Sequence, residues 1–259
     1  MDDLTATADH YRHDGYVLVK GLLSGDEAAT CRTECHALIA RLTDGVDATW
    51  ESARQLDGAG PTASLRHCHD VQQYSAAFSR LLVDERFTAV AAAVVGGPNV
   101  QLHHTKTFVK PPARGAPFPM HQDYPYFPHR AHTVAAAIFH FDDAPESRGC
   151  VRVMPGSHRL GPLPHESSAG GWNLPIDEWP LERAVAVPAD AGDVLFFSYL
   201  TVHGSGLNRS REPRTTLLVQ FHDPNDEPVD DSNRALGRGL MLRGVAPAVP
   251  ARADLQRGG

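Results

Sequence analysis

The chain has 259 residues, of which 42% are hydrophobic and 21% charged, and its 24 basic residues are outnumbered by 31 acidic ones. This composition is ordinary for a folded globular protein and excludes global disorder, while the net charge of −7 excludes the broad basic surface typical of nucleic-acid binding. Barrels and sandwiches of this length commonly form one domain. We therefore expect a single domain over residues 1–259, with no nucleic-acid partner and an oligomeric state that stays open.

The N-terminal sequence MDDLTATADHYRHDG lacks the apolar core of a secretory signal. The longest apolar runs, such as AVAAAVV from Ala89, are much shorter than the ~20 residues that span a bilayer, so no membrane partner is expected. The four cysteines, Cys31, Cys35, Cys68 and Cys150, contain no C-x-x-C pair, which suits a reducing compartment. The sequence thus predicts a soluble, cytoplasmic protein.

The first part of the chain is predicted to be helical, up to about residue 97. A short strand at Tyr16–Val19 leads to a helix that Ser24 caps, with Glu27 three residues later as in a capping box. This helix should run to about Leu42, and residues 43–63, which lack periodicity, should form a loop. Two more helices are expected, at about 75–82 and at Glu85–Val95, where Gly96 and Gly97 follow.

Beyond Pro98 the pattern changes to strands. In VQLHHTKTFVK the side chains of Leu102, His104, Lys106 and Phe108 should share one face, because side chains alternate along a strand. Further strands are expected at 133–141, 149–154, 184–187, 193–197 and 215–221. Many short strands separated by turns favour a mainly β fold with flanking helices, a sandwich, barrel or jelly roll, with its core at about 98–223. An irregular insertion at about 161–182 could form a lid, and residues 237–259 are predicted to be a flexible tail.

The segment MHQDYPY contains a His-x-Asp pair. In an extended segment His121 and Asp123 project to the same side, so they could occupy two adjacent positions on a divalent metal, and a third ligand would complete a 2-His-1-carboxylate face. The pair alone is weak evidence, since a second His-x-Asp is present at His140 and Asp142. That second pair is interpreted as an acidic surface turn that closes a strand.

A candidate for the third ligand is His203, in AGDVLFFSYLTVHGSGLNRSREPR, where it follows an apolar strand. Arg214 begins the next predicted strand. An arginine facing inward is costly unless it meets an anion, and its planar fork suits a carboxylate. The sequence therefore predicts an acidic ligand beside the metal.

Four motifs in order, HDGYVLVKGLLS, MHQDYPYFPH, GCVRVMPGSHRLGPLPH and AGDVLFFSYLTVHGSGLNRSREPR, resemble the phytanoyl-CoA dioxygenase family of Fe(II)/2-oxoglutarate oxygenases. The resemblance implies a double-stranded β-helix of the jelly-roll, cupin-like kind. It implies Fe(II) bound by His121, Asp123 and His203, and 2-oxoglutarate as cosubstrate. It further implies that Arg214 and Ser205 bind the distal carboxylate of 2-oxoglutarate and that Lys106 is a basic residue near the cosubstrate.

The implied reaction converts 2-oxoglutarate and O2 into succinate and CO2 and hydroxylates a substrate. Related halogenases carry a small residue in place of the aspartate, so Asp123 favours hydroxylation. The substrate is predicted to be a small molecule of specialised metabolism, compact and cyclic, aromatic or derived from an amino acid. Its pocket is expected to involve the side chains of His104, Tyr124, Tyr126 and Phe127, with His129 as a further candidate.

Three alternatives to this function remain open. The first is the acyl-CoA hydroxylation of the family's name, which a modest basic rim of Lys110, Arg114 and Arg130 would favour; no glycine-rich phosphate motif supports it. The second is a catalytically silent cupin-like binding protein. The third is a zinc hydrolase, for which Arg214 would lack a role. Elsewhere, His67 and His69 lack further ligands at zinc-like spacing and are interpreted as surface residues.

Overall fold

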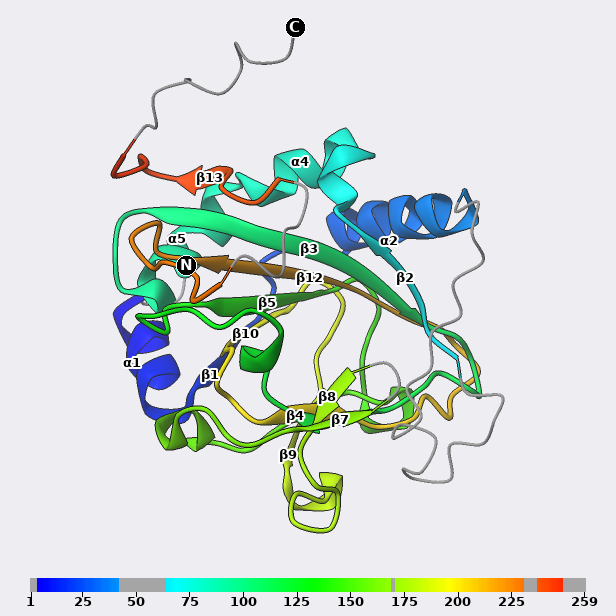
Figure 1. Cartoon of the computed structure of the whole chain (residues 1–259). Helices are drawn as coiled ribbons and strands as arrows, with labels where there is room; N and C mark the ends of the chain where they lie inside the picture. Colours follow the sequence, from blue (N-terminus) through cyan, green and yellow to red (C-terminus); the bar gives the residue numbers. More distant parts are fainter. Residues whose placement is uncertain (1–3, 42–63, 169–170, 231–236, 249–259) are drawn as a thin grey trace, which may run out of the picture.

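The computed structural model describes residues 4–41, 64–168, 171–230 and 237–248 (Figure 1). The helices are α1 (Leu4–Asp14), α2 (Gly25–Ala40), α4 (Ala76–Leu82) and α5 (Glu85–Val95). The short 3-10 turns are η1 (Val71–Gln73), η2 (Tyr124–Tyr126), η3 (Glu146–Arg148), η4 (Ser157–Leu160) and η5 (Leu181–Arg183). The strands are β1 (Tyr16–Val19), β2 (Arg66–His69), β3 (Val100–Lys110), β4 (Phe118–His121), β5 (Ala135–His140), β6 (Val151–Val153), β7 (Glu166–Ser168), β8 (Gly171–Asn173), β9 (Val185–Val187), β10 (Val194–Ser198), β11 (His203–Ser205), β12 (Arg214–His222) and β13 (Met241–Arg243).

Two antiparallel sheets form the body of the protein. The larger has the strand order β1-β10-β5-β12-β3-β13, with β2 paired to β3, and the smaller has the order β4-β11-β6-β9. Strands far apart in the sequence are neighbours, for example β4 and β11, and β1 and β10. This is the double-stranded β-helix expected from the sequence, a mainly β jelly roll with flanking helices.

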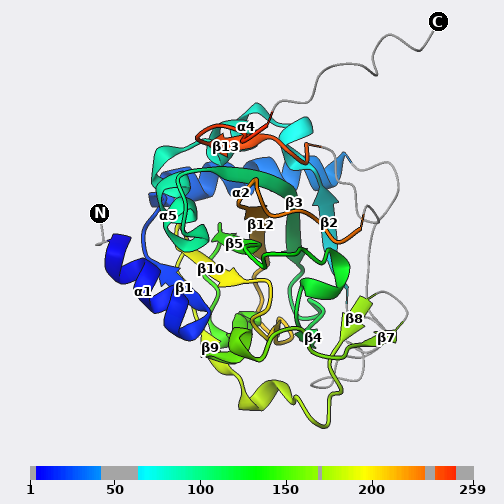
Figure 2. The same ribbon diagram turned by 60° about the vertical axis from the view of Figure 1, so that its left-hand side comes forward.

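Helices α2, α4 and α5 cover the outer face of the larger sheet, and the smaller sheet lies on its other side (Figures 1 and 2). Strand β12 shows how alternation divides the residues between these two environments. Leu217, Val219 and Phe221 join the core beneath the helices, whereas Leu218 and Gln220 face the cavity between the sheets. The inner face of the larger sheet is therefore free to contribute to a site.

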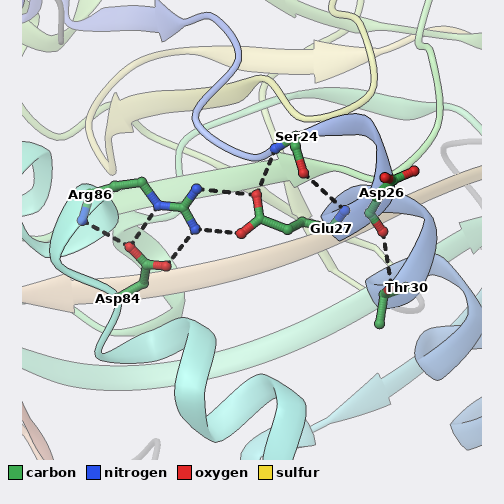
Figure 3. A network of polar contacts seen from close by, with 6 residues as sticks. All are labelled: Ser24, Asp26, Glu27, Thr30, Asp84 and Arg86. Atoms are coloured by element: carbon green, nitrogen blue, oxygen red, sulfur yellow. Dashed lines mark hydrogen bonds and ion pairs between the residues drawn. The ribbon is translucent and has the colours of Figure 1, made fainter.

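The capping box at the start of α2 is confirmed and extends into a network of ion pairs (Figure 3). The Glu27 backbone N–H donates to Ser24 Oγ at 3.2 Å, and the Ser24 backbone N–H donates to Glu27 Oε2 at 2.7 Å. Arg86 bridges the carboxylates of Glu27 and Asp84. Helix α2 ends at Ala40, and the predicted continuation to Leu42 and the loop at 43–63 lie outside the described residues.

Helix α1 was not predicted from the sequence. Thr7 and Tyr11 are its buried residues, so the apolar periodicity that marks an amphipathic helix is almost absent. The helix packs against α5 and β1. Its formation therefore depends on tertiary contacts that sequence periodicity does not report.

The flexible tail predicted for residues 237–259 is wrong in its first part. Met241–Arg243 forms β13, which pairs with the start of β3, and the side chain of Leu242 is buried against the helices. The apolar run at residues 240–242 is only three residues long and is bounded by glycine and arginine, too short a pattern to predict a strand.

The single face predicted for Leu102, His104, Lys106 and Phe108 is also wrong at one end. The β3–β12 register shifts between Gln220 and Phe221, which pair with His104 and Leu102, so His103 is an extra residue in β3. A bulge of this kind reverses the alternation. Leu102 consequently joins the core beneath the helices, while the other three residues line the cavity.

The insertion at 161–182 contains the β7–β8 hairpin and η5. Beside the hairpin, the Trp172 backbone N–H donates to the hydroxyl of Tyr126 at 2.8 Å, which joins the insertion to η2. Among the described residues, no helix is long and apolar enough to cross a membrane.

Candidate metal and anion site

Three potential metal ligands meet between the sheets, at the paired ends of β4 and β11. His121 and His203 stand directly opposite each other in the register of the two strands, and their ring centroids are 4.3 Å apart. Asp123 follows β4 and turns its Oδ1 toward both rings, 3.7 Å from His121 Nε2 and 3.8 Å from His203 Nε2. Within the described part of the chain, this is the one group of three such residues whose ligand atoms all lie within 4.8 Å of one another.

The hydrogen bonds of the two imidazoles leave the nitrogens that face Asp123 unprotonated. His121 Nδ1 lies 2.7 Å from the carbonyl oxygen of Pro119, and His203 Nδ1 lies 2.9 Å from that of Thr201. A carbonyl oxygen can only accept, so each Nδ1 carries the proton and each Nε2 presents a lone pair. The site therefore offers two neutral nitrogen donors and one carboxylate oxygen, which fits a 2-His-1-carboxylate face for Fe(II).

Burial sets the protonation of these ligands in the absence of a cation. Loss of solvation lowers the pKa of His121 to about 3 and that of His203 to about 4, so both rings stay neutral at pH 7. Burial also raises the pKa of Asp123 to about 6. A divalent cation would reverse this last shift, because it favours the ionised carboxylate.

Gln220 on β12 orients the Asp123 carboxylate and was missed in the sequence. Its Nε2 donates to Asp123 Oδ2 at 2.6 Å, which leaves Oδ1 for the two histidines. The side chain is 1% exposed, and its Oε1 has no hydrogen-bond partner. The bulge at His103 sets Gln220 opposite His104, and the sequence around it contains no signal that predicts a bulge.

A second group of polar side chains, deeper in the interior, fits an anion. Arg214 is 4% exposed and donates through Nη1 to the carbonyl oxygen of Gly149, while its Nε has no partner. Burial lowers the pKa of Arg214 to about 10, so the guanidinium remains charged at pH 7. Gly149 has φ +67°, and a Cβ there would lie 2.2 Å from the carbonyl oxygen of Gly206. The close approach beside Arg214 therefore requires glycine.

Lys110 also belongs to this second group, although the sequence suggested that it lay at a basic rim. It stands opposite Arg214 in the β3–β12 register and is fully buried. Its Nζ donates to Ser205 Oγ and to the carbonyl oxygen of Gly206, both at 2.7 Å. Burial, and next the charge of Arg214, hold the pKa of Lys110 well below its usual value. Lys110, and not Lys106, is the lysine beside Ser205 and Arg214.

One cavity of about 330 Å³ connects the metal ligands to Arg214. Of the residues predicted for the substrate pocket, His104, Tyr126 and Phe127 line this cavity, as does Lys106. Tyr124 does not line it. The η2 turn directs that ring away from the cavity, and it packs against Tyr199 with 5.6 Å between ring centroids.

His129 lies outside the cavity lining as well. It is fully buried near His103 and His222, behind the wall that Phe127 forms. By contrast, His69 lines the cavity and is exposed, in agreement with the surface position expected from the sequence. Its strand, β2, is an edge strand beside β3.

The rival pair His140 and Asp142 is not part of this site, and its interpretation as a surface turn is wrong. His140 is fully buried and Asp142 is 6% exposed. Asp142 accepts a hydrogen bond from the Thr215 backbone N–H at 2.9 Å and pairs with Arg32 at 3.1 Å. The carboxylate therefore joins α2 to the end of the larger sheet.

A jelly roll that brings two histidines, a carboxylate and a buried arginine to one cavity is typical of the iron- and 2-oxoglutarate-dependent oxygenases. Comparison with known proteins agrees, since the family model "Phytanoyl-CoA dioxygenase (PhyH)" matches residues 11–216. The chain belongs to this family. The enzyme class expected from the sequence, an Fe(II)/2-oxoglutarate-dependent dioxygenase that uses O2 and a small-molecule substrate, is confirmed.

The relatives include enzymes with different substrates. The peroxisomal phytanoyl-CoA dioxygenase of Bos taurus is 29% identical over 85% of this chain and 68% of its own length. A probable alpha-ketoglutarate-dependent hypophosphite dioxygenase of Stutzerimonas stutzeri is 26% identical over 95% of this chain and 88% of its own length. Among solved structures, the epimerase SnoN in complex with Fe3+, alpha ketoglutarate and nogalamycin RO has a TM-score of 0.71 and 27% identity, covering 93% of this chain and 98% of SnoN.

Proposed function

We propose that His121, Asp123 and His203 bind the Fe(II) ion of this dioxygenase. The observation that carries the assignment is the convergence of two unprotonated Nε2 atoms on one carboxylate oxygen. Bound iron supplies the site for 2-oxoglutarate and O2, since a facial triad leaves three adjacent coordination positions for them. The protein's part is to hold the ligands and to exclude water.

We propose that Arg214, Ser205 and Lys110 bind the distal carboxylate of 2-oxoglutarate. Arg214 supplies the charge, and its Nε is a buried donor without a partner. Lys110 and Ser205 are already joined by a hydrogen bond at the same place. A buried guanidinium is strongly destabilising unless an anion meets it, so this group disfavours both a silent binding protein and a zinc hydrolase.

We further propose that the substrate is a compact small molecule of specialised metabolism and that the enzyme hydroxylates it. A cavity of about 330 Å³ is at the small end of ligand sites, and it must also hold 2-oxoglutarate. Of the three residues of the suggested basic rim, Lys110 is buried and unavailable to the phosphates of coenzyme A. The likeness to SnoN supports a natural-product substrate, while the phytanoyl-CoA relatives keep an acyl-CoA as the alternative.

The proposal that the protein works in the cytoplasm rests on its thiols. All four cysteines are free and buried. Cys31 and Cys35 share the inner face of α2, and burial raises the pKa of Cys31 to about 11. Unreactive thiols with structural packing roles suit a reducing compartment.

The test of the function measures succinate formation with Fe(II), 2-oxoglutarate and O2, together with anaerobic Fe(II) binding. His203→Ala should abolish both succinate formation and tight Fe(II) binding. The matched control is His222→Asn, which removes a buried imidazole whose Nδ1 also bonds a backbone carbonyl but which lies outside the cavity. If His203→Ala kept normal turnover while His222→Asn lost it, the ligand assignment would be wrong.

Competition distinguishes the two substrate classes. Acyl-CoA thioesters, their free acids and a panel of compact cyclic and amino-acid-derived compounds are compared by the 2-oxoglutarate that each one consumes. We expect turnover to be stimulated by members of the compact panel. Efficient hydroxylation of a thioester whose free acid is inert would establish the acyl-CoA alternative.

A further inference from the structure

Lys106 is a partly buried cation on the cavity wall. The Asp123 carboxylate is near enough to act on its pKa but forms no ion pair with it. Its side chain lines the cavity, and its Nζ lies 4.9 Å from the centroid of the Phe108 ring. It makes no hydrogen bond or ion pair with any residue that the structure describes. Its partner across the β3–β12 ladder is Leu218, which offers no polar atom. An ammonium with three unused donors in such a place calls for an anionic ligand.

The position of Lys106 separates it from the anion group at Arg214. Lys110 stands opposite Arg214, and Lys106 is four residues back along the same strand, a distance of about 13 Å between the backbone positions. It lies two residues from His104, which pairs with Gln220 near the metal ligands. Lys106 is therefore at the metal end of the cavity, where the substrate must approach.

The charges of the occupied site also leave Lys106 unbalanced. A divalent ion and Arg214 together offset Asp123 and the two carboxylates of 2-oxoglutarate. Lys110 has two acceptors for its Nζ, and its pKa is lowered by burial, which favours the uncharged amine. Burial lowers the pKa of Lys106 only to about 8, so it is largely protonated at pH 7. The Asp70 carboxylate also lines the cavity, but the acidic group that acts on the pKa of Lys106 is Asp123. Beside the metal ligands one positive charge then remains, and a monoanion would balance it.

We propose that Lys106 binds a carboxylate group of the substrate, with His69 and His104 as neighbouring neutral donors. Partial loss of solvation, and next the charges of neighbouring groups that include Lys106, favour uncharged imidazoles, with the pKa of His104 lowered to about 3 and that of His69 to about 4. Each ring can therefore donate one hydrogen bond from a protonated nitrogen. The apolar walls, which include Phe108 and Phe127, hold the remainder of the molecule. This assignment rests on the proposed function, because it requires the metal and 2-oxoglutarate to occupy their own positions.

The experiment compares 3-phenylpropionate with 3-phenylpropionamide, which share a skeleton and differ in charge. Their binding is measured by anaerobic titration calorimetry on enzyme that holds Fe(II) and saturating 2-oxoglutarate. The variants are Lys106→Met, which removes the charge but keeps the length of the side chain, and Lys106→Arg, which keeps the charge. Lys20→Met is the control, since Lys20 is an exposed lysine before α2. A separate titration measures the affinity of each variant for 2-oxoglutarate.

We expect the wild type, Lys106→Arg and Lys20→Met to bind the carboxylate at least tenfold more tightly than the amide. Lys106→Met should lose this preference while its 2-oxoglutarate affinity stays within threefold of the wild type. The inference is overturned if the wild type shows no preference for the carboxylate, or if Lys106→Met retains the preference. It is also overturned if Lys106→Met loses 2-oxoglutarate affinity tenfold, because Lys106 would then serve the cosubstrate. Failure of the wild type to bind 2-oxoglutarate at all would instead refute the proposed function.

Discussion

Replacing Gln220 by leucine should weaken metal binding without unfolding the protein. The amide donates to Asp123 Oδ2 at 2.6 Å, between residues that are 1% and 9% exposed. This bond holds the carboxylate so that Oδ1 alone faces the two histidines. In Gln220→Leu the carboxylate can rotate and offer both oxygens, which would change the coordination and occupy a position that a facial triad leaves open.

The size of the effect follows from the burial of this hydrogen bond. A hydrogen bond to a charged group contributes about 1.5–3 kcal/mol, and about 1.4 kcal/mol corresponds to a factor of ten in an equilibrium constant. Metal affinity should therefore fall by about 10- to 150-fold, within the usual range for residues that orient metal ligands. The metal-free protein should keep most of its stability, since leucine fills a similar volume and removes a buried Oε1 that has no partner.

The assay is anaerobic titration of the protein with Co(II), which reports affinity by calorimetry and coordination by its ligand-field absorption. Gln101→Leu is the matched control, because Gln101 lies on the same sheet and its Nε2 donates to the carbonyl oxygen of Gly239, away from the metal ligands. Gln220→Leu should change both the affinity and the spectrum, and Gln101→Leu should change neither. A Gln220→Leu protein that binds Co(II) within twofold of the wild type, with the same spectrum, would refute the positioning role.

Three further predictions concern the anion group, acid stability and the ion pairs at α2. Arg214→Ala should raise the dissociation constant of 2-oxoglutarate at least tenfold, since it removes charged hydrogen bonds of about 1.5–3 kcal/mol each. The affinity for Fe(II) should stay nearly unchanged. Anaerobic titrations of both ligands check this, and an unchanged 2-oxoglutarate affinity would contradict it. The free energy of unfolding of the metal-free protein should fall as the pH drops from 6.5 toward 4. Burial lowers the pKa of His103 to about 2 and that of His222 to about 4, so in this pH range these imidazoles bind protons in the unfolded chain and stay neutral in the folded one. Each of these histidines should contribute a slope of about 1.4 kcal/mol per pH unit, and urea titrations that give a flat profile between pH 6.5 and 5 would refute this reasoning. Arg86→Ala should lower the free energy of unfolding, measured in urea, by no more than about 1 kcal/mol, because the Arg86 and Glu27 side chains are 46% and 44% exposed. The loss should be smaller in 1 M salt, where screening increases. A larger, salt-independent loss would show that the network in Figure 3 has a packing role.

The features predicted correctly from the sequence depend on short-range rules. The Ser24 and Glu27 capping box needs four consecutive residues, and helix α5 has the predicted bounds because Asp84 caps its start and Gly96 its end. The proximity of His121, Asp123 and His203 could be predicted because the first two are two residues apart and because the motif around His203 carries a family resemblance. Residue composition alone gives no reason to place His203 beside His121 and Asp123.

The features that were missed depend on long-range pairing. Lys106 and Lys110 share the inner face of β3, and nothing in the local sequence says which of them meets Ser205, a residue on a different sheet. That choice follows from the β3–β12 register, which sets Lys110 opposite Arg214. The extra residue at His103 then determines that Leu102 leaves the inner face and that His104 is paired with Gln220 near Asp123. A bulge one residue long thus separates the residues that pack beneath the helices from those available for substrate, and such a bulge is defined by two strands together rather than by either one.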